Sequence, residues 1–201
     1  MTRTVCLTCR KADVMCYCED IRPFASNPQF VILLHPKESR KAINTGRMAF
    51  LHLKNALLLT DSCFDGNQPL KRLILDPGKR CHLLFPGPDA LDIAHWKSAS
   101  TRDDRQDVFI ILDATWAMAK KMYRQSRCLQ VLPQVMFRPE QPSQFLIRKQ
   151  PHPDCFSTIE TIHHIIEVMG THPTGEHHHL LRVFGTMVQK QIDYEMTNSP
   201  S

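Results

Sequence analysis

The sequence lacks any apolar run of about 20 residues, the length that a helix needs to cross a bilayer. Its first residues, MTRTVCLTCRKADVMCYC, contain no apolar segment of the kind found in secretory signals. Internal repeats, low-complexity tracts and long blocks of like charge are also absent. We therefore expect a cytoplasmic protein without a membrane partner, in a compartment where disulfide bonds are rare.

The composition is that of a globular chain with a moderate positive charge. The 201 residues leave room for one domain and a small appendage, and the hydrophobic fraction of 42% is enough for a substantial core. The formal net charge is +5 at pH 7. That charge permits a nucleic-acid partner, but basic enzymes without such a partner are common, so charge alone does not choose.

Short apolar runs alternate with segments of helical spacing, which predicts an α/β fold. We expect a mainly parallel sheet with helices on both faces, because strands buried on both sides are continuously apolar. The expected strands are 29–34, 56–59, 81–85, 108–112, 134–137 and 145–147. The expected helices are 41–54, weakened or broken at Gly46, then one beginning after Asp113, then 157–169 and 176–196. Residues 96–107 are predicted to form a loop.

Four of the expected strands end in groups that suit a binding site. These ends are His35-Pro36, Thr60-Asp61, Pro86-Gly87-Pro88 and Asp113-Ala114-Thr115-Trp116. In parallel sheets, ligands bind beyond the carboxyl ends of the strands. We therefore expect the functional site at this edge of the sheet.

The amino-terminal segment is dense in cysteine. Four of the eight cysteines fall within thirteen residues, namely Cys6, Cys9, Cys16 and Cys18. Two close pairs of thiolates can fill the closed tetrahedral shell of a structural zinc ion, which would supply folding free energy to a segment with little core. Four unrelated reduced cysteines and an iron–sulfur cluster are the alternatives. We predict a zinc-binding segment over residues 1–24, followed by a main domain over residues 25–201.

Two groups of basic residues flank the expected site. Residues 35–54 contain Lys37, Arg40, Lys41, Arg47 and Lys54 against one acid, and Arg148, Lys149 and His152 form a smaller group. Such groups can contact phosphates. They can equally form a solvated helix face, and the residues by themselves leave both interpretations open.

Two hydroxyl-rich helix starts carry acids. Asp113 has a structural interpretation as the cap of the following helix, and Ser157 with Glu160 fits a capping box. Together with other blocks, they make the chain resemble the DTW-domain family, the tRNA-uridine aminocarboxypropyltransferases. The blocks, in family order, are the four-cysteine motif, His35-Pro36-Lys37-Glu38 with Asn44-Thr45-Gly46, Phe85-Pro86-Gly87-Pro88-Asp89-Ala90, Asp113-Ala114-Thr115-Trp116 and Ser157-Thr158-Ile159-Glu160. Ala114 departs from the family, in which glycine is frequent at that variable position.

The resemblance implies a fold, a donor and a reaction. The fold would be related to the SPOUT class, with a carboxyl-terminal trefoil knot. The donor would be S-adenosylmethionine, and the reaction would move its 3-amino-3-carboxypropyl group to N3 of a uridine in tRNA, releasing methylthioadenosine. The choice of tRNA, and of variable loop or D-loop, stays open, and we expect a monomer.

The resemblance also implies roles for individual residues. Asp113 would be the general base or would orient the uridine. Hydroxyls at a helix start suit the donor's carboxylate, and Glu160 suits its ammonium group. The predicted donor-binding residues are Leu59, Thr60, Phe85, Pro86, Gly87, Leu112, Thr115, Trp116, Ser157, Thr158 and Glu160. The predicted RNA-binding residues are Arg40, Lys41, Arg47, Lys54, Arg148 and Lys149. The run His177-His178-His179 is interpreted only as a polar helix start.

Three other functions compete with this one. A SPOUT-type RNA methyltransferase would use the same donor but release S-adenosylhomocysteine. A non-enzymatic, zinc-dependent RNA-binding module would bind tRNA without the donor. A nucleotide hydrolase using Asp113 and Asp61 would depend on magnesium.

Overall fold

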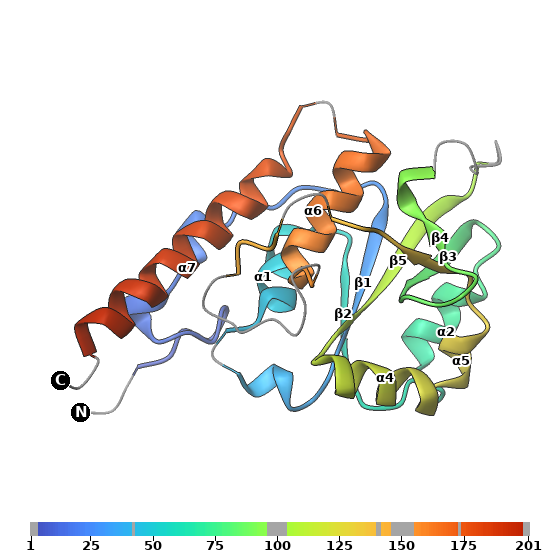
Figure 1. The fold of residues 1–201 in the computed structure, drawn as a ribbon, viewed down its shortest axis with the longest axis horizontal. Coiled ribbons are helices and arrows are strands. Elements are labelled where there is room, and N and C mark those ends of the chain that lie inside the picture. Colours follow the sequence, from blue (N-terminus) through green and yellow to red (C-terminus); the bar gives the residue numbers. More distant parts are fainter. Residues whose placement is uncertain are drawn as a thin grey trace.

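The chain folds around a parallel sheet. The computed structural model describes residues 4–41, 43–95, 104–139, 142–145, 155–172 and 174–198. Within them, six strands pair in the order β2-β1-β5-β3-β6-β4, and every pair is parallel (Figure 1). The strands are β1 (Gln29–Leu34), β2 (Leu57–Thr60), β3 (Lys79–Leu84), β4 (Leu91–Asp92), β5 (Gln106–Asp113) and β6 (Gln134–Met136).

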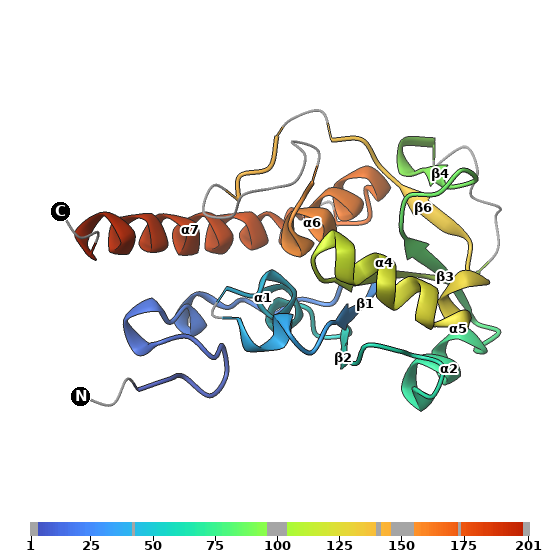
Figure 2. The same ribbon diagram turned by 60° about the horizontal axis from the view of Figure 1, so that its bottom comes forward.

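Helices cover both faces of this sheet, as predicted. The helices are α1 (Thr45–His52), α2 (Gln68–Ile74), α4 (Trp116–Gln125), α5 (Arg127–Gln130), α6 (Thr158–Met169) and α7 (His178–Asn198). Core contacts place α1, α6 and α7 on one face and α2, α4 and α5 on the other (Figure 2). Short 3-10 turns are η1 (Asp13–Met15), η2 (Cys18–Asp20), η3 (Glu38–Arg40) and η4 (Ile93–His95). The trefoil knot stays a prediction.

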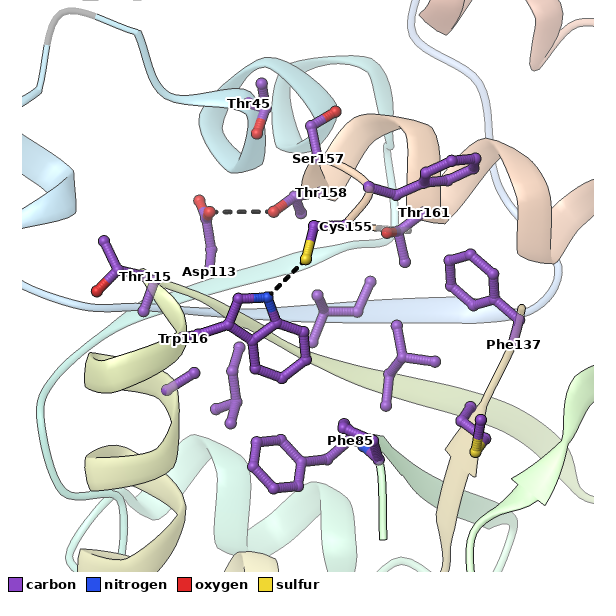
Figure 3. Close-up of a pocket in the computed structure, with 18 of the residues that line it drawn as sticks. Thr45, Phe85, Asp113, Thr115, Trp116, Phe137, Cys155, Ser157, Thr158 and Thr161 are labelled. Atoms are coloured by element: carbon purple, nitrogen blue, oxygen red, sulfur yellow. Dashed lines mark hydrogen bonds between the residues drawn. The ribbon is translucent and has the colours of Figure 1, made fainter. Parts of the chain in front are cut away.

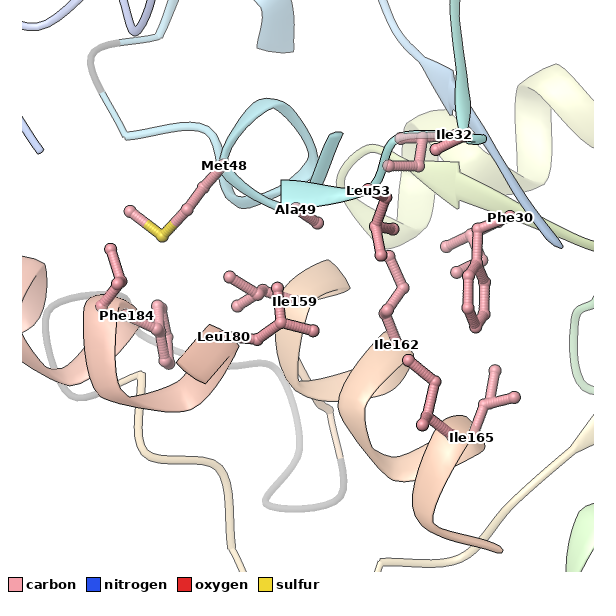
Figure 4. Close-up of a cluster of buried hydrophobic side chains, with 14 of the residues drawn as sticks. Phe30, Ile32, Met48, Ala49, Leu53, Ile159, Ile162, Ile165, Leu180 and Phe184 are labelled. Carbon is pink, nitrogen blue, oxygen red and sulfur yellow. The ribbon is translucent and has the colours of Figure 1, made fainter. Parts of the chain in front are cut away.

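Strand β1 shows why the sheet is buried on both sides. Successive side chains of a strand point to opposite faces. Phe30 and Ile32 enter the core beneath α1, α6 and α7, whereas Val31 and Leu33 enter the core beneath α2, α4 and α5. Figure 4 shows the first of these cores. Each fully buried side chain of this size contributes about 1.5–3 kcal/mol, so the continuous apolar run favours the strand at the centre of a covered sheet.

Helix α1 begins later than predicted, at Thr45 rather than at residue 41. The Asn44 side chain caps it by accepting a hydrogen bond of 2.6 Å from the N–H of Arg47. Gly46 lies in the first turn and does not break the helix.

Several other elements differ from the predictions. Helix α2 and the two-residue strand β4 were not predicted, and β5 begins at Gln106, inside the segment expected to be a loop. Phe145 is not in a strand, and the rest of the strand predicted over 145–147 lies outside the described residues. Among the helices that the structure describes, none is both long and apolar enough to cross a bilayer.

The amino-terminal segment packs on the main domain and does not form a core of its own. Cys9, Tyr17 and Phe24 are buried in the same cluster as α1, α6 and α7. The Nζ of Lys190 in α7 donates a 3.5 Å hydrogen bond to the carbonyl of Cys16. Figure 1 shows this segment running alongside α7. The domain boundary between residues 24 and 25 stays a prediction.

Candidate active site

A large cavity lies where the sequence predicted a site, at the carboxyl ends of β3, β5 and β6. Its volume is about 1190 Å³, and the start of α6 closes one side (Figure 3). Typical small-molecule pockets measure roughly 300–1,000 Å³. The cavity therefore has room for a nucleotide-sized molecule together with part of a second one.

Asp113 lies on the wall of this cavity. It is the last residue of β5, and its side chain is buried, with 8% of the residue exposed. Its Oδ1 accepts a hydrogen bond of 3.0 Å from the hydroxyl of Thr158, the first residue of α6. The predicted acid thus meets the second hydroxyl-rich helix start directly, although 45 residues separate them in the chain.

The first turn of α1 also contacts the Asp113 carboxylate. A Cβ atom added to Gly46 would overlap Asp113 Oδ2, so this approach requires glycine. Thr45 of α1 and Thr158 of α6 both line the cavity beside Asp113. Helix N-termini carry partial positive charge and unpaired N–H groups. The starts of α1 and α6 therefore attract negative charge. They can stabilise the Asp113 carboxylate, or the carboxylate of a ligand bound beside it.

Asp113 is not the cap of the helix that follows it. The cap is Thr115, whose Oγ1 accepts a 3.4 Å hydrogen bond from the N–H of Met118. The interpretation of Asp113 as the cap of this helix is therefore wrong.

Trp116 is a wall of the cavity rather than a core residue. It is 40% exposed, and its Nε1 donates a 3.0 Å hydrogen bond to Cys155 Sγ (Figure 3). Phe85 lies 6.3 Å from it, centroid to centroid, and stacks on Tyr123 at 4.7 Å. Aromatic faces of this kind suit the flat, apolar surface of a nucleobase.

A second aromatic pair lines the other side of the cavity. The rings of Phe137, after β6, and Phe156, before α6, meet edge to face with centroids 5.5 Å apart. Neither residue was predicted to belong to the site. Their position depends on β6 being the neighbour of β3, which the sequence pattern does not indicate.

The structure brings most of the predicted donor-binding residues together, but not all of them. Phe85, Pro86, Leu112, Thr115, Trp116, Ser157 and Thr158 line the cavity. Leu59 and Thr60 do not, because β1 separates β2 from β5. Gly87 does not line it either. A Cβ added to Gly87 would overlap the side-chain oxygen of Gln134, so this glycine lets its loop pack against β6.

Glu160 lies behind the cavity wall. The predicted capping box is present: its carboxylate accepts hydrogen bonds from the N–H and hydroxyl of Ser157, at 2.8 and 2.6 Å. It also accepts from the N–H of Gln144 at 2.7 Å and from the hydroxyl of Ser143 at 2.8 Å. Glu160 thus ties residues 143–144 to the start of α6, and its contact with a donor ammonium stays a prediction.

Among the residues that the structure describes, three cations line the cavity. Lys41 was predicted, whereas Lys120 of α4 and Arg138 after β6 were not. Lys120 lies one helical turn beyond Trp116, and that spacing places the two on the same face of α4. The signal was therefore in the sequence. Lys41 also forms an ion pair of 2.6 Å with Glu38.

The other predicted RNA-binding residues have different surroundings. Arg40 and Lys54 are exposed. Arg47 is half-buried beside the amino-terminal segment, and its pKa is lowered, first by burial and then by the charge of Arg10. Arg148 and Lys149 lie outside the described residues.

The four amino-terminal cysteines converge. Their Sγ atoms all lie within 4.8 Å of one another, with Cys6 to Cys18 at 3.6 Å and Cys9 to Cys16 at 3.7 Å. Tetrahedral zinc with Zn–S bonds of about 2.3 Å needs sulfur–sulfur distances of about 3.8 Å. The donor set therefore fits structural zinc, which would be held by the four thiolates.

The backbone around these cysteines supports the same geometry. Arg10 has a positive φ of 60°, and its N–H donates to the carbonyl of Cys6 at 2.9 Å, which makes a tight turn after Cys9. Hydrogen bonds from the N–H groups of Cys9 and Thr8 lower the pKa of the Cys6 thiol to about 6, whereas burial and the neighbouring thiols raise the pKa of Cys18. A thiolate is the form that binds a metal.

Comparisons with known proteins converge on one group. A family model described as the DTW domain matches residues 3–192. A tRNA-uridine aminocarboxypropyltransferase 2 of Drosophila melanogaster is 28% identical over 95% of this chain and 76% of its own length. A tRNA-uridine aminocarboxypropyltransferase A of Arabidopsis thaliana is 26% identical over 96% of this chain and 82% of its own length. The mouse protein named tRNA-uridine aminocarboxypropyltransferase 2 is 25% identical over 79% of this chain, and the match spans 54% of its length. No solved structure matches the chain.

Proposed function

Since the chain belongs to the DTW-domain family, we propose that it is a tRNA-uridine aminocarboxypropyltransferase that uses S-adenosylmethionine. The product would be a uridine bearing the 3-amino-3-carboxypropyl group on N3, and the by-product would be methylthioadenosine. One observation carries the proposal: the Asp113 carboxylate, held by Thr158, lies on the wall of a cavity with room for a donor and a base.

The proposed reaction needs one proton acceptor and one leaving group. The Asp113 carboxylate takes the proton from uridine N3, and the N3 lone pair then forms a bond to the donor's γ-carbon. The carbon–sulfur bond breaks, and its electron pair goes to the sulfonium sulfur, which leaves as the neutral thioether of methylthioadenosine. The hydrogen bond from Thr158 and the close approach of Gly46 hold this carboxylate in position at the cavity wall.

The cavity offers different walls to different parts of the donor. The start of α6, with the hydroxyls of Ser157 and Thr158, suits the donor's carboxylate. Phe85, Pro86 and Trp116 offer an apolar surface to the adenosine. Such positioning matters because the sulfonium already activates the carbon, and alignment of nitrogen, carbon and sulfur then limits the rate.

The proposed tRNA surface combines the predicted cations with those at the cavity. Lys41, Lys120 and Arg138 would contact phosphates next to the target uridine, and Arg40 and Lys54 would extend this contact. The uridine must leave its stack to enter the cavity. A structural zinc ion would order the amino-terminal segment. A cytoplasmic location and a monomeric state stay predictions.

The test is a product analysis that separates the competing functions. The purified chain is incubated with bulk tRNA and S-adenosylmethionine labelled in the carboxyl carbon, and the nucleosides and the small product are identified by mass. We expect labelled aminocarboxypropyluridine and methylthioadenosine. S-adenosylhomocysteine with a methylated nucleoside would indicate a methyltransferase, and tRNA binding without either product would indicate a binding module.

A further inference from the structure

A second group of metal-ligating side chains lies at the junction of α6 and α7. Among the described residues, two groups have ligand atoms within 4.8 Å of one another: the four cysteines, and the group of His163, Glu167, His177 and His178. The second group shares no residue with the cavity lining. The DTW motif and the proposed transfer reaction give it no role.

Two helices supply these side chains. His163 and Glu167 lie four residues apart on α6, so they share one face of that helix. His177 directly precedes α7, and His178 is its first residue. The sequence indicated this histidine run only as a polar helix start. In the structure, the rings of His177 and His178 face α6.

Two of the distances between these side chains match the spacing of ligand atoms around one metal ion. His163 Nε2 lies 3.2 Å from His178 Nδ1, and His178 Nδ1 lies 3.5 Å from Glu167 Oε1. In tetrahedral zinc with ligand bonds of about 2.1 Å, neighbouring ligand atoms are about 3.4 Å apart. His177 Nε2 also contacts the same Glu167 oxygen.

The surroundings hold this arrangement in place. Gly175 has a φ of 70°, and a Cβ added to it would lie 2.9 Å from the His178 ring, so the turn before α7 brings the ring into position only with glycine there. His177 is 3% exposed, and its Nδ1 is buried without a hydrogen-bond partner among the described residues.

We propose that His163, Glu167, His177 and His178 bind a divalent transition metal, with zinc as the first choice. Imidazole ligands suit zinc, and four protein ligands fill a tetrahedral shell and leave no position for catalysis. The site is therefore structural and joins α7 to α6. Helix α7 also holds the amino-terminal segment through Lys190, so the two metals would stabilise the same layer of the molecule. The inference is independent of the proposed reaction.

The test counts zinc in the full chain after loading with excess zinc and desalting. We expect two equivalents in the wild type and one in either His178→Gln or Glu167→Gln, whose side chains are 61% and 44% exposed and tolerate substitution. The exposed His95 lies outside the group, so His95→Gln is the matched control and should hold two. Cys16→Ser should lose only the amino-terminal ion.

Thermal stability supplies a second readout that does not depend on activity. The metal-stripped Cys16→Ser variant should be stabilised when zinc is added, and the Cys16→Ser, His178→Gln double variant should not be. The proposal is overturned if both α6–α7 variants hold as much zinc as the wild type. That result would leave a hydrogen-bonded network of three histidines and one glutamate.

Discussion

At the scale of single residues, the proposed site rests on the close approach of Gly46 to the Asp113 carboxylate. The glycine belongs to α1 and the acid to β5, and the carboxylate can lie at the start of α1 only because residue 46 has no side chain. Neither the strand pattern nor the helix pattern predicts this contact. The sequence placed Asp113 at a strand end correctly. It indicated Gly46 as a weak point in a helix and as part of a family block, but not as a neighbour of Asp113.

This contact reverses the usual effect of replacing a helical glycine. Glycine to alanine in a helix normally stabilises by about 0.5–1 kcal/mol. Gly46→Ala should instead destabilise the protein by about 1–3 kcal/mol, as overpacking does. It should also lower turnover about 10²-fold by displacing the carboxylate.

Urea denaturation and steady-state kinetics measure both effects. Gly185→Ala is the control, because Gly185 lies in α7 with no atom within 4 Å of an added Cβ, and it should be neutral or stabilising. A Gly46→Ala protein as stable and as active as the Gly185→Ala protein would show that the carboxylate does not need this position.

Among the elements, the strands followed from the sequence better than the helices did. Strands β1 and β5 are continuous apolar runs, and burial on both faces explains that pattern. Helix α2 was missed although Asn67 caps it with a 3.0 Å hydrogen bond and Pro69 lies in its first turn. Strand β4 has two residues, too few for any period to show.

The capping box at the start of α6 does more than cap the helix, because the Glu160 carboxylate also accepts a hydrogen bond from the backbone N–H of residue 144. Glu160→Ala should leave buried N–H groups without partners, at a cost of about 1–3 kcal/mol. The KM for the donor should rise, since the start of α6 lines the cavity. Chemical denaturation and donor titration measure these effects. Thr186→Ala, on the exposed face of α7, should change neither quantity.

Helix α1 ends in a histidine that should make stability depend on pH. His52 is fully buried, its Nδ1 donates to the carbonyl of Met48 at 2.8 Å, and its Nε2 has no hydrogen-bond partner among the described residues. Burial lowers its pKa below the ordinary value of 6.5. The unfolded chain therefore binds a proton that the folded chain does not, and stability is lost as pH falls below about 6.5.

The matched variant is His52→Gln. Unfolding free energies of wild type and variant, measured from pH 7.5 to 5, should approach each other by up to about 1.4 kcal/mol per pH unit below 6.5. Parallel curves for the two proteins would mean that His52 keeps its ordinary affinity for protons after folding.

At the level of the whole molecule, sheet order decides which predicted residues meet. The sequence correctly indicates that strand ends share one edge, but it does not indicate that β1 lies between β2 and β5, or that β6 lies beside β3. For that reason Leu59 and Thr60 were predicted at the site, whereas Phe137 and Arg138 were missed. Periodicity fixes which residues an element buries, and long-range pairing fixes which elements are neighbours.

The distribution of cations over the molecule should set the salt dependence of tRNA binding. Lys120→Ala and Arg138→Ala should each weaken binding and lower the slope of log Kd against log salt by about 1, if each contacts one phosphate. Arg72→Ala is the control, because Arg72 is exposed on α2 and does not line the cavity. Equal slopes in all three variants and the wild type would remove the cavity cations from the tRNA surface.

The molecule as a whole is proposed to present one ionised carboxylate to a nucleobase and a sulfonium donor at the same time. Single-turnover formation of methylthioadenosine from preloaded donor and tRNA, measured after chemical quenching and compared between wild type and Asp113→Asn, follows that step independently of product release. The amide keeps the shape and the hydrogen bond to Thr158 but accepts no proton from N3, so the rate should fall about 10²- to 10⁴-fold with tRNA affinity and folding unchanged. A variant that releases methylthioadenosine at the wild-type rate would contradict a role for Asp113 as the base.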